Sequence, residues 1–279
     1  MKYSTIQAVV MDMDGVLWRG DKPMNGLQEM FIWLHEQDIP YMLATNNSGK
    51  TPAEYVAKLA SMDVKGVTES RILTSGIATA TYLQSRYAPG TRMFVVGGNG
   101  IRTALDDSGF DISGESDDPI EVVVVGIDLD LNYERMKQAT IAILAGAEFI
   151  GTNPDVTFPT PDGLAPGAGS VIAMLESATE QKATIIGKPY PAMFETALAT
   201  MNVSAENALM IGDRINTDIT GAQGVGMQTA LVFTGVTTPE ALTTSDIWSD
   251  VAYEDLSEVV KAWAGHDWYR EQIKAKRAH

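Results

Sequence analysis

The chain has 279 residues, 45% of them hydrophobic, which is enough to bury one large core or two modest ones. Its formal net charge of −16 argues against nucleic acids and anionic membranes as partners, because proteins bind both mainly through clustered Lys and Arg. The chain has no Cys and three His, so disulfides, thiolate metal sites and cysteine nucleophiles are excluded, and a metal would have to be held by oxygen.

The first apolar run of the chain ends at a pair of carboxylates. Residues 8–11 predict a short strand buried on both faces, as in a parallel sheet under helices. Asp12 and Asp14 follow it, one residue apart, so on an extended segment their side chains point the same way. In open α/β sheets, ligands bind at the carboxyl ends of the strands. The alternative is a turn in which Asp and Gly15 merely suit the backbone.

The rest of the chain alternates predicted strands and helices, which is typical of an α/β protein with a parallel sheet. Further strands are predicted at residues 41–44, 72–74, 93–96, 122–125, 149–150, 184–186, 208–211 and 229–232. Helices are predicted after Asn25, from residue 51, at 76–84, around 101–105, from 132, around 171–175, at 193–201 and 218–225, and from 257. We expect Asn25 to be an N-cap, and the Pro/Gly-rich segment from Asn153 to Gly169 to be a long loop.

Four of the predicted strands end in residues that can do chemistry. These residues are Asp12 with Asp14, Thr45, Lys188 and Asp213. Because the carboxyl ends of parallel strands lie at one edge of a sheet, we expect all of them to converge there. Each alone has an ordinary explanation, such as an N-cap, a surface lysine or a turn residue, but four such coincidences favour a functional site.

The converging residue types suit phosphoryl transfer. Asp12 can attack phosphorus as a carboxylate nucleophile, while Asp14 protonates the leaving oxygen and later deprotonates the hydrolytic water. Thr45 and the backbone N–H groups beyond it can bind the phosphoryl oxygens, and Lys188 can balance their charge. Asp213 completes with Asp12 an all-oxygen site that suits Mg²⁺.

The motifs that carry these residues resemble a known family. They are similar to the four ordered motifs of the haloacid dehalogenase-like (HAD) phosphatase superfamily, and the second to fourth are similar in wording to its NagD-like, 4-nitrophenylphosphatase branch. The motifs are Asp12-Met13-Asp14-Gly15, Thr45-Asn46-Asn47, Gly187-Lys188-Pro189 and Gly212-Asp213-Arg214-Ile215-Asn216-Thr217-Asp218. The resemblance covers nearly the whole chain.

The resemblance implies a Rossmann-like core with helices on both faces of its sheet. It implies that Asp12, the backbone carbonyl of Asp14, and Asp213 hold Mg²⁺, with Asp218 as a supporting acidic residue. It also implies a short flap at about residues 17–24. For the phosphate, we expect Thr45, Asn46, Asn47 and Lys188 to form the binding site.

Motif spacing predicts an inserted domain. About 30 residues separate Asp14 from Thr45, whereas about 140 separate Thr45 from Lys188, which leaves room for a domain of ordinary size. We predict a catalytic core at residues 1–78 plus 182–279, and a smaller α/β cap at 79–181. The cap is expected to select the substrate, with Asn153 and Asp155 of the long loop as candidate contacts; a structural role for that loop is the alternative.

The sequence therefore predicts a Mg²⁺-dependent phosphatase that hydrolyses a small phosphorylated metabolite through an aspartyl-phosphate. Another HAD chemistry, a phosphonatase or dehalogenase-type hydrolase, is the first alternative, although the acid at Asp14 favours phosphate esters. A non-catalytic binding module on the same fold is the second. We expect no nucleic-acid or membrane partner and a monomer or homodimer. A cytoplasmic location is expected, since the opening residues lack a secretory pattern and no apolar run spans a bilayer.

Overall fold

The computed structural model describes residues 3–113, 119–160, 162–265 and 268. Its residue contacts divide the chain into two compact units. Unit 1 comprises Met1–Ala44, Val56–Ile72 and Ala197–His279, and unit 2 comprises Thr45–Tyr55 and Leu73–Thr196. The chain is of the mixed α/β class, with a six-stranded sheet and a separate four-stranded sheet.

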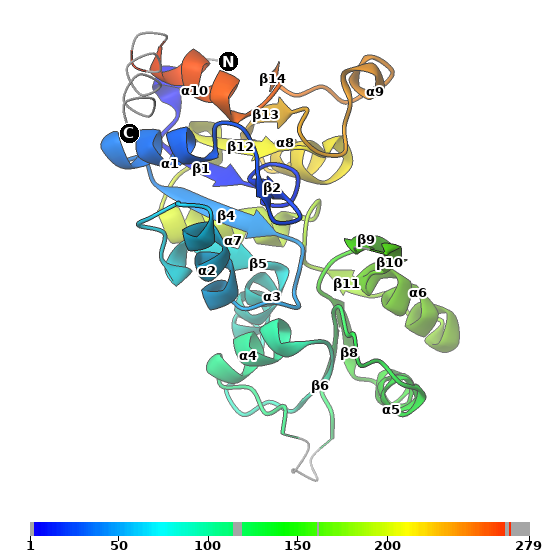
Figure 1. Ribbon diagram of the computed structural model, residues 1–279. Helices are drawn as coiled ribbons and strands as arrows, with labels where there is room; N and C mark the ends of the chain where they lie inside the picture. The colour runs from blue at the N-terminus through cyan, green and yellow to red at the C-terminus, as the bar shows by residue number, and fades with distance from the viewer. Residues whose placement is uncertain (1–2, 114–118, 161, 266–267, 269–279) are drawn as a thin grey trace. The chain divides into compact units, whose positions relative to one another are not determined.

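The six-stranded sheet brings the first carboxylates next to the fourth motif. Its strand order is β14-β13-β12-β1-β4-β5 (Figure 1). The bounds are β1 (Ala8–Met11), β4 (Tyr41–Thr45), β5 (Ile72–Thr74), β12 (Ala208–Gly212), β13 (Gln228–Val232) and β14 (Val251–Tyr253). β1 is parallel to both neighbours, and its last residue, Met11, pairs with Ile211 and Leu43. Since β1 and β12 are buried throughout, the continuous apolar runs predicted these strands correctly.

Helices alternate with the strands of this sheet along the chain. They are α1 (Leu27–Glu36), α2 (Pro52–Ser61), α7 (Pro191–Met201), α8 (Thr220–Gly224), α9 (Pro239–Thr243) and α10 (Leu256–Ala264). Figure 1 shows α1 and α10 side by side. The prediction that Asn25 caps α1 is wrong, because Gly26 in the left-handed region is the N-cap and Asn25 Nδ2 donates to Asp255 Oδ2 at 2.7 Å.

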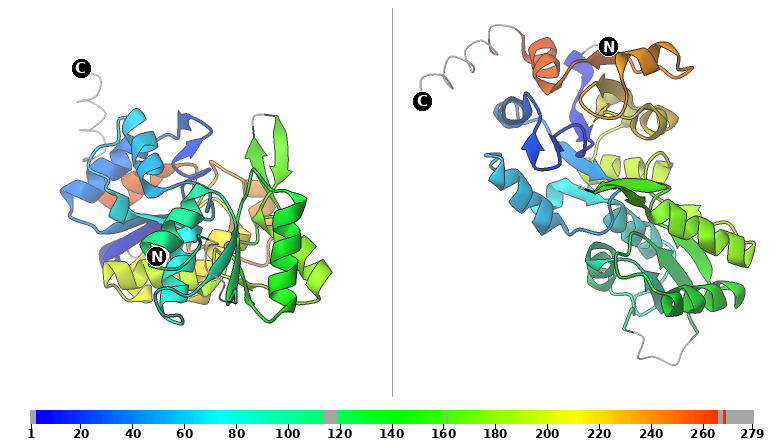
Figure 2. Two further views of the ribbon diagram at one scale, coloured as in Figure 1. Left: turned by 90° about the horizontal axis from the view of Figure 1, so that it is seen from below. Right: turned by 45° about the vertical axis from the view of Figure 1, so that its right-hand side comes forward.

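The four-stranded sheet belongs to unit 2 and has the order β11-β8-β7-β6. Its strands are β6 (Met93–Val96), β7 (Val122–Val125), β8 (Glu148–Gly151) and β11 (Thr184–Ile185), all parallel to their neighbours. The helices of this region are α3 (Ser75–Gln84), α4 (Asn99–Asp107), α5 (Tyr133–Leu144) and α6 (Ala168–Thr179). The helices α5 and α6 pack on each other and on the strands, and the two lie along the sheet in Figure 2.

The position of β11 corrects one prediction. Residues 184–186 were expected to form a strand of the same sheet as Asp12, but β11 pairs with β8, where Thr184 faces Ile150. An apolar run of this length satisfies either sheet equally well, so its pattern does not indicate the partner strand.

Two isolated hairpins complete the fold. β2 (Trp18–Arg19) and β3 (Lys22–Pro23) pair within the segment expected to be a flap. β9 (Thr157–Thr160) and β10 (Gly163–Pro166) form an antiparallel ribbon where an irregular loop was predicted. The prolines of that ribbon favoured the prediction of a loop. A two-stranded ribbon nevertheless tolerates Pro, because both strands have a free edge. Across the described residues, the structure has no helix with the length and apolar character needed to cross a membrane.

Candidate active site

Three buried carboxylates meet at the carboxyl ends of β1 and β12. Asp12, Asp213 and Asp218 each offer an oxygen within 4.8 Å of the others. They are 9%, 1% and 1% exposed. Buried carboxylates at this separation repel one another and lose hydration, so a cation among them would be strongly stabilising. With oxygen as the donor atom throughout, the cluster could hold a divalent metal ion.

The loop after β12 fixes two of these carboxylates. Asp218 lies in the π-helical turn Ile215–Ile219, and its Oδ2 accepts the backbone N–H groups of Asp213 and Arg214 at 3.2 and 3.1 Å. Asp213 Oδ2 accepts the N–H of Val236 at 2.7 Å. Asp218 therefore shapes the loop that presents Asp213, in addition to lying in the cluster itself.

Glycines make room for Asp213. A Cβ atom at Gly235 would lie 1.8 Å from Asp213 Oδ2, and one at Gly15 would lie 2.6 Å from the same atom. Gly15 also has φ +94°, in the region that favours glycine. The glycine of the first motif is thus required both by its backbone and by the neighbouring carboxylate.

Asp14 has a different environment from the three clustered carboxylates. It follows Asp12 by two residues but is exposed to solvent, and its Oδ1 accepts a hydrogen bond from Trp18 Nε1 at 2.8 Å. Two carboxylates of one motif therefore have separate surroundings, one buried beside a possible cation and one open. Such a division suits one nucleophile and one proton carrier.

The second and third motifs meet inside unit 2. Asn46 Oδ1 accepts the Lys188 N–H at 2.8 Å, and Asn46 Nδ2 donates to the Lys188 carbonyl at 2.9 Å. Lys188 is 2% exposed. A Cβ atom at Gly187 would lie 2.7 Å from Asn46 Oδ1, so a glycine is needed beside this clamp. Thr45 is buried, and its Oγ1 accepts the N–H of Asn47 at 3.2 Å.

Asn153 supports the same junction. Its Nδ2 donates to the Asn46 carbonyl at 2.8 Å, and its Oδ1 accepts the N–H of Asp155 at 3.1 Å. Ser75 Oγ donates to the same Asn46 carbonyl at 2.6 Å. The Asn46 and Asn153 amides thus join loops in this structure, while the roles expected for them and for Asp155 at the substrate stay predictions.

A cavity of about 470 Å³ lies within unit 2 next to this loop. Its polar lining includes Asn47 and Lys50, and its apolar lining includes Ile127, Leu129 and Phe158. Arg102 and Arg135 also line it, together with Asp128 and Asp130. Polar groups around an apolar wall are typical of sites for small organic ligands.

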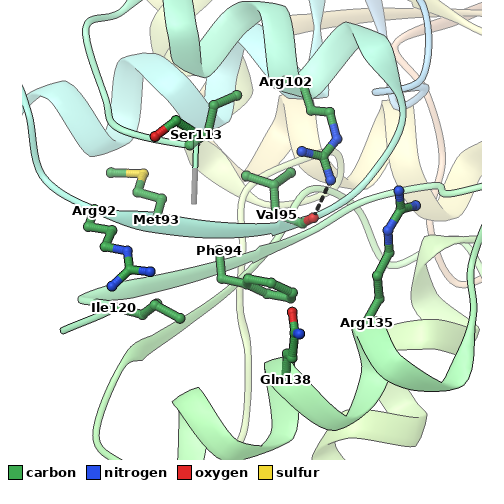
Figure 3. Close-up of a pocket in the computed structure, with 10 residues that line it drawn as sticks. Arg92, Met93, Phe94, Val95, Arg102, Ser113, Ile120, Arg135 and Gln138 are labelled. Carbon is green, nitrogen blue, oxygen red and sulfur yellow. Dashed lines mark hydrogen bonds between the residues drawn. The ribbon is translucent and has the colours of Figure 1, made fainter. Parts of the chain in front are cut away.

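The two arginines of this wall also border a second cavity of about 210 Å³ along β6. Figure 3 shows Arg102 donating to the Val95 carbonyl, with Arg135 nearby and Arg92 just before the start of β6. Burial and then the charge of Arg135 lower the pKa of Arg102, and Asp128 partly offsets this. The Arg135 guanidinium pairs with Asp128 at 2.7 Å.

Comparison with known proteins identifies the class. Residues 9–111 match a family model described as haloacid dehalogenase-like hydrolase, and residues 185–259 match one described as HAD-hydrolase-like. The acid sugar phosphatase of Staphylococcus haemolyticus is 35% identical over 251 residues, which are 90% of this chain and 94% of that protein. The chain therefore belongs to the haloacid dehalogenase-like hydrolases, and it is a phosphatase of that class.

Solved structures narrow the assignment to a branch. The 4-nitrophenylphosphatase from Thermotoga maritima has a TM-score of 0.88 at 33% identity, covering 94% of this chain and 98% of that one. NagD from E. coli K-12 has a TM-score of 0.84 at 30% identity, covering 91% and 98%. The protein is a member of the NagD-like branch, as the wording of its motifs predicted.

Sequence reasoning missed two contributors to the site. Trp18 bonds directly to Asp14, and Gly235 leaves space for Asp213. An indole four residues after Asp14 is a signal that could have been noticed, because a buried Trp N–H usually has an acceptor. Gly235 lies too far along the chain from any motif to be found this way.

Proposed function

We propose that the protein is a Mg²⁺-dependent phosphomonoesterase that hydrolyses a small phosphorylated metabolite through an aspartyl-phosphate on Asp12. The observation that supports this most is the convergence of Asp12, Asp213 and Asp218 beside an exposed Asp14. Asp12, Asp213 and the Asp14 carbonyl are the proposed ligands. Bound there, Mg²⁺ would offset the negative charge of the carboxylates and the phosphoryl group.

Two carboxylates carry the proposed reaction. An Asp12 oxygen attacks phosphorus, and the bond from phosphorus to the ester oxygen breaks as Asp14 gives that oxygen a proton. Water then attacks the phosphorus of the aspartyl-phosphate, its proton passes to Asp14, and the Asp12 carboxylate is released with inorganic phosphate. Thr45, Lys188 and the backbone N–H groups after Thr45 are proposed to bind the phosphoryl oxygens, on the basis of their motifs.

We further propose that residues 79–181 act as the cap and that the 470 Å³ cavity receives the leaving group. Support comes from its lining, since Asn47 of the second motif lines the same cavity as Phe158 of the β9–β10 hairpin and Ile127. A mixed polar and apolar wall suits a hydroxylated or heterocyclic leaving group. The relatives named acid sugar phosphatase make sugar phosphates the first compounds to test.

The test measures phosphate release from 4-nitrophenyl phosphate with Mg²⁺ and with EDTA, for the wild type and Asp12→Asn. We expect EDTA to abolish turnover and Asp12→Asn to lower kcat by more than about 10³-fold, because the nucleophile is lost. Asp246→Asn, which removes an exposed carboxylate elsewhere in unit 1, is the matched control. Substantial activity in EDTA or in Asp12→Asn would contradict the mechanism.

The carboxyl group of Asp14 also helps to distinguish the proposed phosphatase from the two alternative functions. Dehalogenase-type chemistry needs no proton donor for its leaving group, whereas an alkoxide leaving from phosphate does. A non-catalytic module would bind phosphate esters without releasing phosphate, so the same assay decides between binding and hydrolysis.

A further inference from the structure

Asp14 is held at one oxygen by a buried indole. Trp18, the first residue of β2, is 0% exposed, and its Nε1 lies 2.8 Å from Asp14 Oδ1. The backbone closes the same loop, since the Gly15 N–H donates to the Trp18 carbonyl at 2.8 Å. The structure shows no hydrogen bond from any described residue to the other oxygen, Oδ2.

The indole is fixed in turn by its surroundings. Lys58 Nζ lies 4.4 Å from the centroid of the Trp18 ring, and a cation over an indole face is attractive. Because the ring is fully buried and its Nε1 is a donor without acceptor capacity, the direction of the hydrogen bond to Asp14 cannot reverse.

Resting on the proposed phosphomonoesterase mechanism, we propose that Trp18 is a positioning residue that determines which oxygen of Asp14 carries the catalytic proton. Oδ1 accepts from Trp18, and the carbonyl oxygen of a neutral carboxyl is a stronger acceptor than its hydroxyl oxygen, so the hydrogen bond favours the form with the proton on Oδ2. Trp18 touches neither the ester nor phosphorus and acts through the orientation of Asp14.

The proton then follows one route through both half-reactions. Asp14 Oδ2–H gives its proton to the ester oxygen as the bond from that oxygen to phosphorus breaks and the bond to Asp12 forms. In the second half, Oδ2 takes a proton from the attacking water as the bond between Asp12 and phosphorus breaks. Asp14 returns to its starting state, and no other donor is required.

Hydrolysis of esters whose leaving group needs this proton should depend on Trp18. Hydrolysis of esters whose leaving group departs without a proton should not. An alkoxide is a poor leaving group without protonation, whereas 4-nitrophenolate departs as a stable anion. Without the indole N–H, the carboxyl can rotate and present its proton on either oxygen, which weakens the protonation of the leaving group, and kcat/KM reports the steps up to the loss of that group.

The experiment compares kcat/KM for glycerol phosphate and 4-nitrophenyl phosphate in Trp18→Phe at one pH. We expect a loss of about tenfold for glycerol phosphate and of less than about twofold for 4-nitrophenyl phosphate. The ratio of the two values does not depend on how much enzyme is folded, so a partly unfolded variant still gives an answer. Trp33→Phe, a buried Trp of α1 in the same unit, is the matched control and should leave the ratio unchanged.

Equal changes for both esters in Trp18→Phe, or no change in either, would overturn the proposal and assign Trp18 to packing. Asp14→Asn tests the underlying mechanism: its kcat/KM, which covers the steps up to loss of the leaving group, should fall far more for glycerol phosphate than for 4-nitrophenyl phosphate. If Asp14→Asn affects both esters equally, Asp14 is not the acid and the proposed function itself fails. The two failures are therefore distinguishable.

Discussion

Unit 1 and unit 2 hold their functional side chains by different means. In unit 1, several contacts that hold the carboxylates are short in sequence: Asp218 accepts the N–H groups of Asp213 and Arg214, and Trp18 donates to Asp14. In unit 2 the contacts are long in sequence, because Asn46 bonds to Lys188 across 142 positions and Asn153 to Asn46 across 107. The first unit concentrates carboxylates, whereas the second uses neutral amides to join loops.

The difference indicates what each unit contributes. A carboxylate whose supporting groups lie close to it in sequence can be positioned by one loop. Substitutions of such groups in unit 1 should therefore act on the chemical step. An amide that bridges distant segments determines whether those segments meet at all, so changes in unit 2 should act on stability and on ligand binding together.

Breaking the Asn46 clamp should have the largest effect of the three. Asn46→Ala removes two hydrogen bonds to the Lys188 backbone, and burial makes the loss of such bonds costly. We expect the free energy of unfolding to fall by about 2 kcal/mol and KM for 4-nitrophenyl phosphate to rise about tenfold. Thermal or urea unfolding and steady-state kinetics would measure both.

Asn207→Ala is the control variant for the Asn46 prediction. Asn207→Ala removes an exposed amide whose Nδ2 donates to nearby Ser204 Oγ at 3.0 Å, and it should change neither quantity appreciably. If Asn46→Ala weakens phosphate binding while stability stays at the wild-type level, Asn46 contacts the ligand directly. Stability and ligand binding would then not be coupled in unit 2.

Truncating Phe158 should change substrate preference by a smaller amount. The ring lines the 470 Å³ cavity, and an aromatic contact with a ligand contributes roughly 0.5–1.5 kcal/mol. In Phe158→Ala we expect kcat/KM for pyridoxal phosphate and sugar phosphates to fall about two- to tenfold. Glycerol phosphate, which is too small to cover the ring, should be affected less than twofold.

Leu164→Ala is the matched control for this prediction. Leu164 lies on β10, opposite Pro159 of β9, and is 75% exposed without lining the cavity. An unchanged ranking of substrates in Phe158→Ala, or an identical change in Leu164→Ala, would show that the cavity does not receive the leaving group.

The same contrast explains how much the sequence could predict. β1 and β12 could be predicted from short patterns, since each is a continuous apolar run that ends at polar turn residues, which is typical of a strand buried on both faces. The β9–β10 hairpin was mispredicted because its prolines favoured a loop, and the pairing of β11 with β8 was mispredicted because no local pattern names the partner strand. The Asn46 clamp on Lys188 was missed for the same reason, although both residues were recognised as parts of motifs.

The smallest expected effect concerns Asp255, a carboxylate of unit 1 far in sequence from the motifs. It is the N-cap of α10, accepting the Glu258 N–H at 3.2 Å, and it also accepts from Asn25 Nδ2 and Ser257 Oγ. Burial works against its ionisation, but these hydrogen bonds outweigh burial and lower its pKa. A lowered pKa in the folded state stabilises the fold above the unfolded pKa of about 3.9, and this contribution is lost as the pH falls through the folded value.

Asp255→Asn should therefore lower the free energy of unfolding by about 1 kcal/mol at pH 7, with kcat for 4-nitrophenyl phosphate unchanged. The difference from the wild type should shrink when unfolding is measured at a pH below about 4, because the wild-type carboxyl is then becoming neutral as well. A difference that stays constant with pH would mean that the charge of Asp255 is irrelevant and that cap geometry alone matters. A fall in kcat would mean that the α1–α10 contact reaches the carboxylate cluster, so that even unit 1 depends on contacts distant in sequence.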